Sequence, residues 1–507
     1  MIKLITFYSF SLLFSFLLER FAVPRPVFLK RSPYAWLIHI ASITILFVLA
    51  YLIFARAFFA SMLTLTILVL ILAVNNAKFR ALREPLVFSD FVLYMQVFKH
   101  PRFYLPFLSI IHVIAFAAMA IITIYIGLSV ENAAYNHFHL SVSDLLWPAV
   151  LLTAALIILV TGLKGIRIEI DPIDDVKNHG LYATLVAHAL LSFRQTALDQ
   201  SVLDKYKHFQ IEAGNPVKHE SGRLQDIIVI QSESYFDARL LEPKIKNELF
   251  LHYDRIRSQS LQHGRLNVPT WGANTMRAEF AFLTGIPIHE LGLQQFNPYQ
   301  SITRQKIPSI AHYLKTIGYR CICIHPYHAD FFKRHIAIPN FGFDEFIDIE
   351  SFEDVELTNP YIDDLTLADR ILQIQQASSE PLFIFAITME NHGPLHLETI
   401  TTDDEKQVYT QQPPDTYHDL TVYLRHIINA DRMIDRLTTE LAERQSSTLL
   451  CFFGDHVPSM PDVYRTRDYH DPKTNYFLWS PAQQHGKEVD MDVTDLGVEI
   501  IKAAGIS

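Results

Sequence analysis

Polar residues that can bind metal ions or phosphate follow four separate apolar runs in the second half of the chain. Residues 227–231 run into Glu233, 319–324 into His325, 382–387 into His392, and 448–453 into Asp455 and His456. Each run is short and rich in apolar residues, as expected of a buried strand. In open parallel sheets, ligands bind at the carboxyl ends of the strands. These side chains are therefore predicted to converge, although up to 223 residues separate them in sequence.

Glu233, Asp455 and His456 form the predicted metal site. A carboxylate directly followed by an imidazole is a good ligand pair for a divalent cation. Glu233 follows an apolar strand, where a carboxylate is costly to bury without a partner, and a cation would supply that partner. The alternatives are a capped loop with a surface histidine at 455–456, and helix capping by Ser234.

Thr275 lies where an amphipathic helix is predicted to begin, after the turn Gly272-Ala273-Asn274. The backbone N–H groups at a helix N-terminus favour an anionic phosphoryl group. A metal ion beside the hydroxyl would lower its pKa and make it a nucleophile. The alternative is that Thr275 only caps the helix. Arg277 and Glu279 of the same helix are expected to be structural.

The block 325–335, HPYHADFFKRH, offers phosphate ligands. Arg334 can hold a phosphate oxygen with a two-pronged hydrogen bond, and Phe332 offers an apolar wall. His325 is the histidine nearest a strand end, with a structural role as its alternative. His392, in the segment ENHGP, can bind substrate or act as an acid or base.

Strands that alternate with helices must position these residues. Helical patterns at 305–317 and 420–444 lie between the apolar runs, and a further run occupies 476–479. This alternation predicts an α/β domain with a mostly parallel sheet flanked by helices. Because the strands are apolar throughout and not alternating, helices are expected on both faces of the sheet.

Composition separates the chain into two parts. It has 507 residues and a formal net charge of −10, which argues against a general nucleic-acid binder. Residues 1–165 are very apolar and hold 12 basic and 5 acidic residues, so the acidic excess lies in the remainder. The three cysteines, Cys321, Cys323 and Cys451, exclude a disulfide scaffold.

The basic part is predicted to be a transmembrane domain with five helical spans. The spans are expected at about 4–20, 36–55, 57–77, 104–128 and 145–163, where charged residues are almost absent. The first lacks a cleavage site for a signal peptidase and precedes further spans, so we interpret it as a span. The predicted domains are thus 1–165 in the membrane, a helical juxtamembrane connector at 166–220 with a helix at 181–199, and a catalytic domain at 221–507.

The positions of lysine and arginine residues predict how the spans are oriented in the membrane. They lie in loop 19–35 (Arg20, Arg25, Lys30, Arg31) and loop 78–102 (Lys78, Arg80, Arg83, Lys99, Arg102), while loop 131–144 has none. Taken literally, the positive-inside rule places both basic loops and the C-terminal domain in the cytoplasm. Loop 78–102 could instead lie along the bilayer surface against anionic headgroups.

Several short sequence motifs follow one another along the chain. They are E-S at Glu233, G-x-x-T-x-x-x-E-F at 272–280, L-T-G at 283–285, H-P…F-x-R at 325–334, G-F-D-x-F at 342–346, N-H at 391–392 and G-D-H-x-P-S at 454–459. With five apolar segments before them, they make nearly the whole chain resemble the lipoteichoic acid synthase and phosphoglycerol transferase family. That family belongs to the alkaline phosphatase/sulfatase-like superfamily.

The resemblance implies a role for each site residue. Glu233, Thr275, Asp455 and His456 would hold one divalent metal, Mn²⁺ in the first place, with Mg²⁺ or Zn²⁺ as alternatives. Thr275 would be the nucleophile. His325, Arg334 and His392 would bind the phosphoglycerol, and Phe332 would line its pocket. The family usually has Trp at this last position; Phe keeps the apolar wall and lacks the indole N–H.

The resemblance also implies an activity and a location. The chain would be a multi-pass protein of the bacterial inner membrane with its catalytic domain outside the cytoplasm, against the literal charge count. It would move glycerophosphate from phosphatidylglycerol to an envelope glycan, glycolipid or polyglycerophosphate acceptor through a phosphothreonine intermediate, in cell envelope biogenesis. The open alternatives are a metal-dependent phosphodiesterase or sulfatase-like hydrolase, a phosphoethanolamine transferase, and a membrane scaffold or sensor without catalysis.

Overall fold

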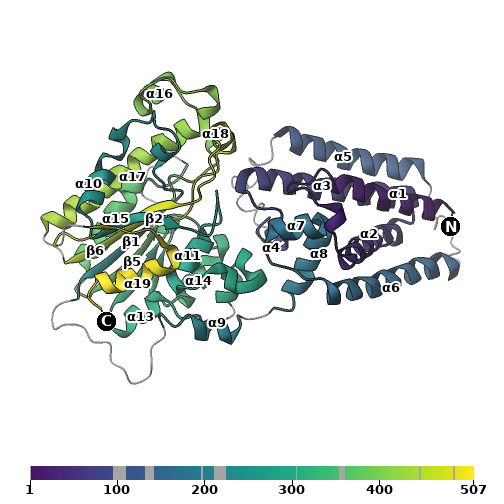
Figure 1. Ribbon diagram of the computed structural model, residues 1–507, viewed down its shortest axis with the longest axis horizontal. Helices are drawn as coiled ribbons and strands as arrows, with labels where there is room; N and C mark the ends of the chain where they lie inside the picture. Colours follow the sequence, from purple (N-terminus) through teal and green to yellow (C-terminus); the bar gives the residue numbers. More distant parts are fainter. Residues whose placement is uncertain are drawn as a thin grey trace. The chain divides into compact units, whose positions relative to one another are not determined.

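The chain divides into two compact units in the computed structural model, Met1–Gln195 and Thr196–Ser507 (Figure 1). The boundary falls inside the predicted connector. The structure describes residues 2–94, 110–131, 142–195, 198–209, 224–303, 305–352, 355, 360–444, 447–482 and 486–506. Lys99, Arg102, residues 104–109 of the predicted fourth span and most of loop 131–144 lie outside these ranges.

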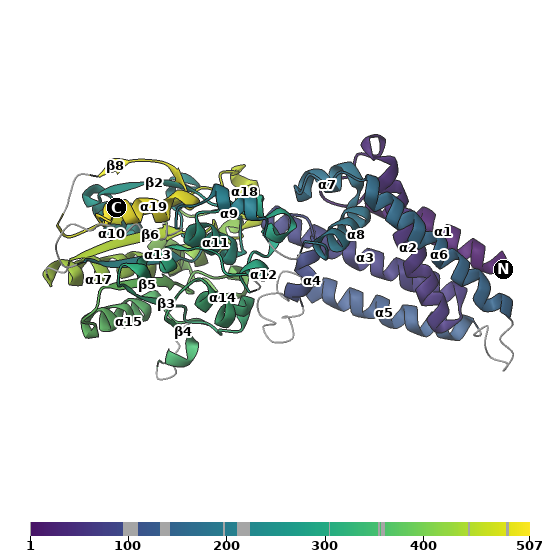
Figure 2. The ribbon, with the colours of Figure 1, turned by 90° about the horizontal axis from the view of Figure 1, so that it is seen from below.

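The first unit is a group of long apolar helices that run alongside one another (Figure 2). They are α1 (Ile2–Glu19), α2 (Pro33–Phe54), α3 (Ala57–Leu82), α5 (Ile110–Val130) and α6 (Val142–Gly165). By length and composition, four helices among the described residues can cross a membrane: α1, α2, α3 and the stretch Leu146–Gly165 of α6. Helix α5 corresponds to the predicted fourth span, and its stretch Ile114–Val130 is apolar but shorter. The predicted all-α domain is confirmed.

The described residues of this unit also form the shorter α-helices α4 (Phe88–Tyr94), α7 (Pro172–His179) and α8 (Leu181–Ser192). Helix α8 packs on α2 and ends at Ser192, so the predicted helix 181–199 is too long. Two residues of the basic loops are neutralised inside the unit. Arg31 Nη1 lies 2.6 Å from Glu19 Oε2, and Lys78 Nζ lies 2.6 Å from Asp90 Oδ2.

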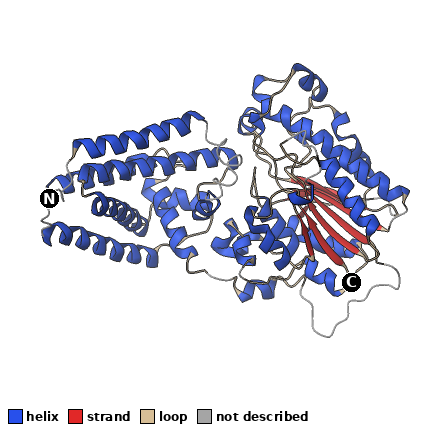
Figure 3. Cartoon of the chain, turned by 180° about the vertical axis from the view of Figure 1, so that it is seen from behind, coloured by secondary structure: helices blue, strands red, loops and turns tan. Residues whose placement is uncertain are grey.

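The second unit is built on one nine-stranded sheet (Figure 3). The strands are β1 (Asp226–Ser232), β2 (Gln262–Asn267), β3 (Arg320–Ile324), β4 (Glu345–Ile347), β5 (Leu382–Ile387), β6 (Thr448–Gly454), β7 (Thr474–Trp479), β8 (Lys487–Glu488) and β9 (Met491–Asp492). Their order is β4-β3-β5-β1-β6-β7-β2-β8, with β9 also paired to β2. Among the strand pairs of the described residues, only β6–β7 and β2–β7 are antiparallel. The predicted mostly parallel α/β sheet is confirmed.

All five predicted strands are present, because most of their residues are apolar and nearly all are buried. The sequence did not predict β2, β4, β8 and β9. Strand β2 reads QHGRLN and is only partly buried, and the other three are two or three residues long. Such strands carry no run of apolar residues that a sequence pattern could detect.

Helices cover both faces of the sheet (Figure 1). On one face lie α10 (Leu251–Gln259), α15 (Asp364–Ala377) and α17 (His418–Glu443), and on the other α11 (Thr275–Thr284), α13 (Ile310–Thr316) and α19 (Val493–Ala503). Shorter helices are α9 (Gln200–Lys205), α12 (Tyr299–Ile302), α14 (Arg334–Asn340), α16 (Thr402–Val408) and α18 (Pro461–Arg467).

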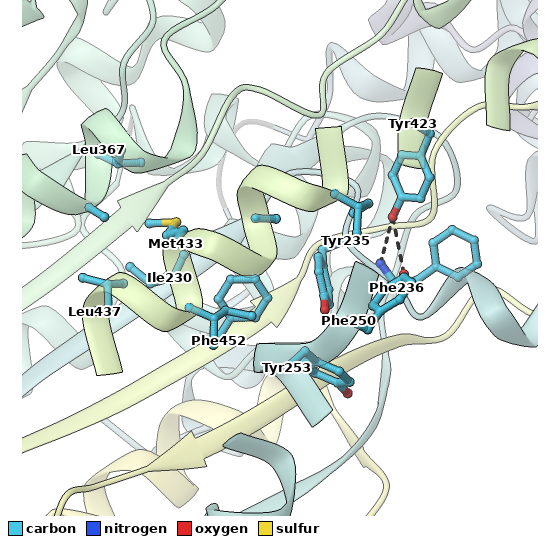
Figure 4. Packing of buried hydrophobic residues seen from close by; sticks show 14 of the residues in the cluster. Ile230, Tyr235, Phe236, Phe250, Tyr253, Leu367, Tyr423, Met433, Leu437 and Phe452 are labelled. Carbon is cyan, nitrogen blue, oxygen red and sulfur yellow. Dashed lines mark hydrogen bonds between the residues drawn. The ribbon is translucent and has the colours of Figure 1, made fainter. Parts of the chain in front are cut away.

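Successive strand residues supply the two cores, as the pleat requires. Ile230 of β1 and Phe452 of β6 belong to one cluster with Met433 and Leu437 of α17 (Figure 4). On the opposite face, Phe282 of α11 packs on Phe385 and Phe453, with ring centroids 5.3 and 5.2 Å apart. The helix that begins at Thr275 is thereby anchored to strands β5 and β6.

Gly454, the last residue of β6, is expected to tolerate no side chain. A Cβ there would lie 1.8 Å from the carbonyl oxygen of Tyr235, so the backbone of β6 or of the loop after β1 would have to move. We expect Gly454→Ala to lower the free energy of unfolding by about 3 kcal/mol or more, measured by urea unfolding.

Gly505→Ala is the matched control for this prediction. Nothing lies within 4 Å of a Cβ at Gly505, and only its positive φ of 69° opposes a side chain. This variant is expected to lose about 1 kcal/mol. Equal losses in the two variants would contradict the role given to close backbone approach at Gly454.

Candidate active site

Four adjacent strands bring the predicted site residues to one edge of the sheet. Strands β3, β5, β1 and β6 are neighbours in that order, and all four are parallel. Ser232 of β1 pairs in register with Gly454 of β6. The next residue on each strand is a site residue, so Glu233 and Asp455 leave the sheet side by side.

The ligand atoms of Glu233, Asp455 and His456 lie within 4.8 Å of one another, and all three residues are buried. His456 Nε2 is 3.5 Å from Glu233 Oε1 and 3.5 Å from Asp455 Oδ2. Ser234 ties the group together, because its N–H donates to Asp455 Oδ1 at 2.8 Å and its hydroxyl donates to Glu233 Oε1 at 2.9 Å. The structure thus brings these three residues into one cluster.

Two atoms of this cluster show that a cation fits it. Asp455 Oδ2 and His456 Nε2 are fully buried and have no hydrogen-bond partner among the described residues. His456 Nδ1 lies 3.0 Å from the Val457 carbonyl and donates to it, so in the neutral ring Nε2 carries a lone pair. That lone pair faces two carboxylate oxygens, which is unfavourable without a positive charge between them. A divalent metal would supply it, and the donor set suits one.

Burial and the neighbouring charges shift the pKa values of the three cluster residues in different directions. Burial raises the pKa of Asp455 to about 7, with a further increase from Glu233. Burial would also raise the pKa of Glu233, but His456 and His392 hold it below its ordinary value. The two nearby carboxylates raise the pKa of His456 despite its burial. In the metal-free protein, Asp455 and His456 therefore both bind a proton more tightly than their free side chains do.

Metal affinity is expected to increase with pH up to about 7, because the proton on Asp455 must leave before a cation can bind. Below that pH, affinity should fall roughly tenfold per pH unit. For the metal-free protein, the raised pKa of Asp455 means that stability is lost as pH rises through the same range. Titration calorimetry at several pH values measures the metal affinity, and thermal unfolding in the presence of chelator measures the stability of the metal-free protein. A metal affinity that does not depend on pH would contradict the assignment of Asp455 as a metal ligand.

Thr275 is the first residue of α11, and its hydroxyl donates to Glu233 Oε2 at 3.2 Å. The residue that precedes the helix is Asn274, which makes no side-chain capping bond. Thr275 is therefore not the N-cap of α11. The Gly272 N–H donates to the Val457 carbonyl at 2.9 Å, which joins the loop before Thr275 to the loop that carries His456.

Left-handed backbone conformations flank three of the site residues. Ser234 has φ 56°, Asn274 has φ 69°, and Phe332 and Lys333 have φ 54° and 58°. Each costs a non-glycine residue about 1–2 kcal/mol. These turns redirect the chain directly beside Glu233, Thr275 and Arg334, and such strain is typical of functional sites.

Arg334 and His325 form a second buried group. Arg334 Nη1 lies 3.2 Å from His325 Nε2, and His325 Nδ1 lies 3.2 Å from the Ile387 carbonyl. Burial and the Arg334 charge hold the pKa of His325 well below its ordinary value, so the ring is neutral. On its other side, Arg334 is paired with Glu279 of α11.

His392 is close enough to both groups to interact with them electrostatically. Its charge interacts with Glu233 and His456 of the cluster and with Arg334, and burial holds its pKa below the ordinary value. Its Nδ1 bonds the Gly393 carbonyl at 2.6 Å. The Phe332 ring lies against the Arg334 guanidinium, with 5.2 Å between the ring centroid and Cζ. All eight predicted site residues thus belong to one region of the second unit.

Sequence reasoning missed several residues that hold this site. Thr388 Oγ1 accepts from the Glu233 N–H at 3.0 Å, and Asn391 Nδ2 donates to the Glu233 carbonyl at 3.0 Å. Tyr299 bonds Glu279. Two of them had a detectable signal: Asn391 belongs to the N-H motif at 391–392, and Glu279 stands four residues after Thr275, on the same side of the helix.

Residues 225–506, more than half of the chain, match the model of the sulfatase family. The chain is 28% identical over 449 residues to the capsular polysaccharide biosynthesis protein RkpI of Rhizobium meliloti, covering 83% of this chain and 77% of that protein.

Two solved structures are similar. Streptococcus pyogenes phosphoglycerol transferase GacH, in complex with sn-glycerol-1-phosphate, aligns with a TM-score of 0.49 and 20% identity over 63% of this chain and 81% of that chain. The integral membrane lipooligosaccharide phosphoethanolamine transferase A of Neisseria meningitidis aligns with a TM-score of 0.53 and 12% identity, over 90% of this chain and 89% of that chain. At that identity the likeness is one of fold.

Proposed function

This chain belongs to the sulfatase family, and from that premise we propose that it is a membrane-bound phosphoglycerol transferase. It would move glycerophosphate from phosphatidylglycerol to an envelope glycan, glycolipid or polyglycerophosphate acceptor. The observation that carries the proposal is the Thr275 hydroxyl, 3.2 Å from Glu233 Oε2 and beside the buried Glu233–Asp455–His456 cluster. A hydroxyl at the N-terminus of a helix, next to a cation site, is suited to attack on a phosphoryl group.

The cysteines support phosphoryl transfer over sulfate ester hydrolysis. Sulfate ester hydrolases of this family use a modified cysteine or serine as nucleophile. Cys321 and Cys323 lie inside β3 and Cys451 lies inside β6, and all three are buried and free. Burial raises the pKa of each thiol. None stands at the position of Thr275.

Glu233, Thr275, Asp455 and His456 would hold the cation, Mn²⁺ in our proposal. When bound there, a divalent cation would lower the pKa of the Thr275 hydroxyl and offset charge on the phosphoryl oxygens. Thr275 Oγ1 attacks phosphorus, and the bond from phosphorus to the diacylglycerol oxygen breaks. The Thr275 proton leaves its hydroxyl, and diacylglycerol takes up one proton as it departs. Glycerophosphate remains as an ester of Thr275.

The second step reverses the first. An acceptor hydroxyl attacks phosphorus, its proton is lost, and the bond to Thr275 Oγ1 breaks as that oxygen regains a proton. Arg334, with His325 and His392, holds the phosphoglycerol in both steps, and Phe332 lines its pocket. The name of the Rhizobium relative, a capsular polysaccharide biosynthesis protein, supports an envelope glycan as the acceptor class. We place the catalytic unit on the extracytoplasmic side of the bacterial inner membrane.

The test is incubation of the purified full-length protein with Mn²⁺ and liposomes of phosphatidylglycerol. We expect release of diacylglycerol and, by intact-mass and phosphopeptide analysis, a glycerophosphoryl adduct on Thr275. Release of diacylglycerol with free glycerol phosphate as the only final product, even with glycan acceptors present, would identify a hydrolase. An adduct from phosphatidylethanolamine alone would identify a phosphoethanolamine transferase. No adduct from either lipid would refute the proposal.

A further inference from the structure

Glu279 is a fully buried carboxylate on the helix of the proposed nucleophile. It stands four residues after Thr275 on α11, one helical turn away and on the same side of the helix. Its relative exposure is 0%. A charged carboxylate at such a place is costly unless it is paired and hydrogen-bonded.

Arg334 and Tyr299 supply those partners. Arg334 Nε donates to Glu279 Oε2 at 3.3 Å, and Nη2 donates to Oε1. The Tyr299 hydroxyl donates to Oε2 as well. Glu279 therefore holds one edge of the guanidinium by two parallel hydrogen bonds, a geometry that fixes the plane of the group. Arg334 and Tyr299 are each 1% exposed, so water does not compete for these bonds.

The hydrogen bonds of Arg334 leave part of its donor capacity unused. Within the described residues, it makes three side-chain hydrogen bonds: two to Glu279 and one between Nη1 and His325 Nε2. A guanidinium has five N–H groups. One N–H on each terminal nitrogen is therefore left, which is the number that a two-pronged bond to phosphate oxygens needs.

We propose that Glu279 is a positioning residue that aims Arg334 at the phosphoryl group. This inference rests on the proposed function. Helix α11 then carries both the Thr275 hydroxyl that attacks phosphorus and the Glu279 carboxylate that orients Arg334. The distance between the two along the helix axis is about 6 Å, set by four residues of regular helix. Tyr299 acts through Glu279 by fixing its carboxylate.

A double-substitution cycle tests whether Glu279 acts through Arg334. The affinity of the full-length protein, with Mn²⁺ and in detergent micelles, is measured by calorimetry for sn-glycerol 1-phosphate and for inorganic phosphate. We expect Arg334→Gln and Glu279→Gln each to weaken binding about tenfold, as for loss of one charge-assisted contact. In the Arg334→Gln background, Glu279→Gln is expected to have no further effect, because contacting residues that act as a unit are not additive.

Two further variants keep the proposal testable if Glu279→Gln fails to fold. Tyr299→Phe leaves the ion pair in place and should weaken binding about threefold, again only when Arg334 is present. Asp254→Asn is the matched control, since Asp254 holds Arg239 by two hydrogen bonds of 2.6 and 2.8 Å in the same unit. It should lower Tm and leave phosphate affinity unchanged.

The outcomes separate this inference from the proposed function. Unchanged affinity in both Glu279→Gln and Tyr299→Phe would overturn the positioning role. Equal weakening by Glu279→Gln with and without Arg334 would overturn it too, because Glu279 would then act independently. In both cases phosphate binding by the natural protein would leave the proposed function standing. Failure of the natural protein to bind either probe would refute the proposed function and this inference together.

Discussion

Thr275→Ala is expected to lower glycerophosphate transfer by about 10³-fold or more, because the variant lacks the hydroxyl that is proposed to form the covalent ester. The protein should still fold, since the substitution only shortens a small side chain whose hydroxyl donates to Glu233 Oε2 in the metal cluster. Diacylglycerol release from phosphatidylglycerol liposomes measures the effect, and intact mass should show no adduct. Far-UV circular dichroism and Tm check the fold.

Two control variants sharpen this expectation. Thr275→Ser keeps the hydroxyl and should retain measurable transfer and an adduct. Thr284→Ala removes a threonine hydroxyl at the other end of α11, where Oγ1 donates to the Phe280 carbonyl at 2.7 Å. It should lower Tm and leave transfer per folded molecule unchanged. Full activity of Thr275→Ala would refute the nucleophile assignment.

Asp455→Asn is expected to abolish tight metal binding, with a loss in affinity of about 100-fold or more. The substitution keeps the shape of the side chain but removes the charge of a group whose Oδ2 has no hydrogen-bond partner among the described residues. Because the pKa of Asp455 is raised in the metal-free protein, the neutral amide should fold at least as well when chelator is present. Metal stoichiometry by plasma mass spectrometry and affinity by calorimetry measure the effect.

Asp431→Asn is the control for a buried aspartate without a metal role. Asp431 accepts from the N–H groups of His252 and Tyr253 at 3.0 and 2.7 Å at the start of α10. Its substitution should destabilise the protein and leave one metal per chain. Unchanged stoichiometry in Asp455→Asn, or equal loss in both variants, would remove Asp455 from the metal site.

Local sequence determined the elements and the chemistry of the site. The apolar run IIVIQ is the middle of β1 and TLLCFF is most of β6, since a strand that is apolar on both sides is typical of a sheet covered by helices on both faces. The polar residues directly after these runs had to lie at the sheet edge, so Glu233, Asp455 and His456 were recognisable as candidates. The long apolar segments were equally plain, because a span needs only length and hydrophobicity.

Tertiary structure alone decided which candidates meet. The order β3-β5-β1-β6 places His325, Glu233 and Asp455 on neighbouring strands, and the register of Ser232 with Gly454 sets the latter two side by side. No residue pattern encodes strand order, because every buried parallel strand has the same apolar character. The pairing of Glu279 with Arg334 is likewise a contact across 55 residues. Glu279 looks structural in the sequence, and its link to Arg334 exists only because the fold brings these two side chains of α11 and α14 into contact.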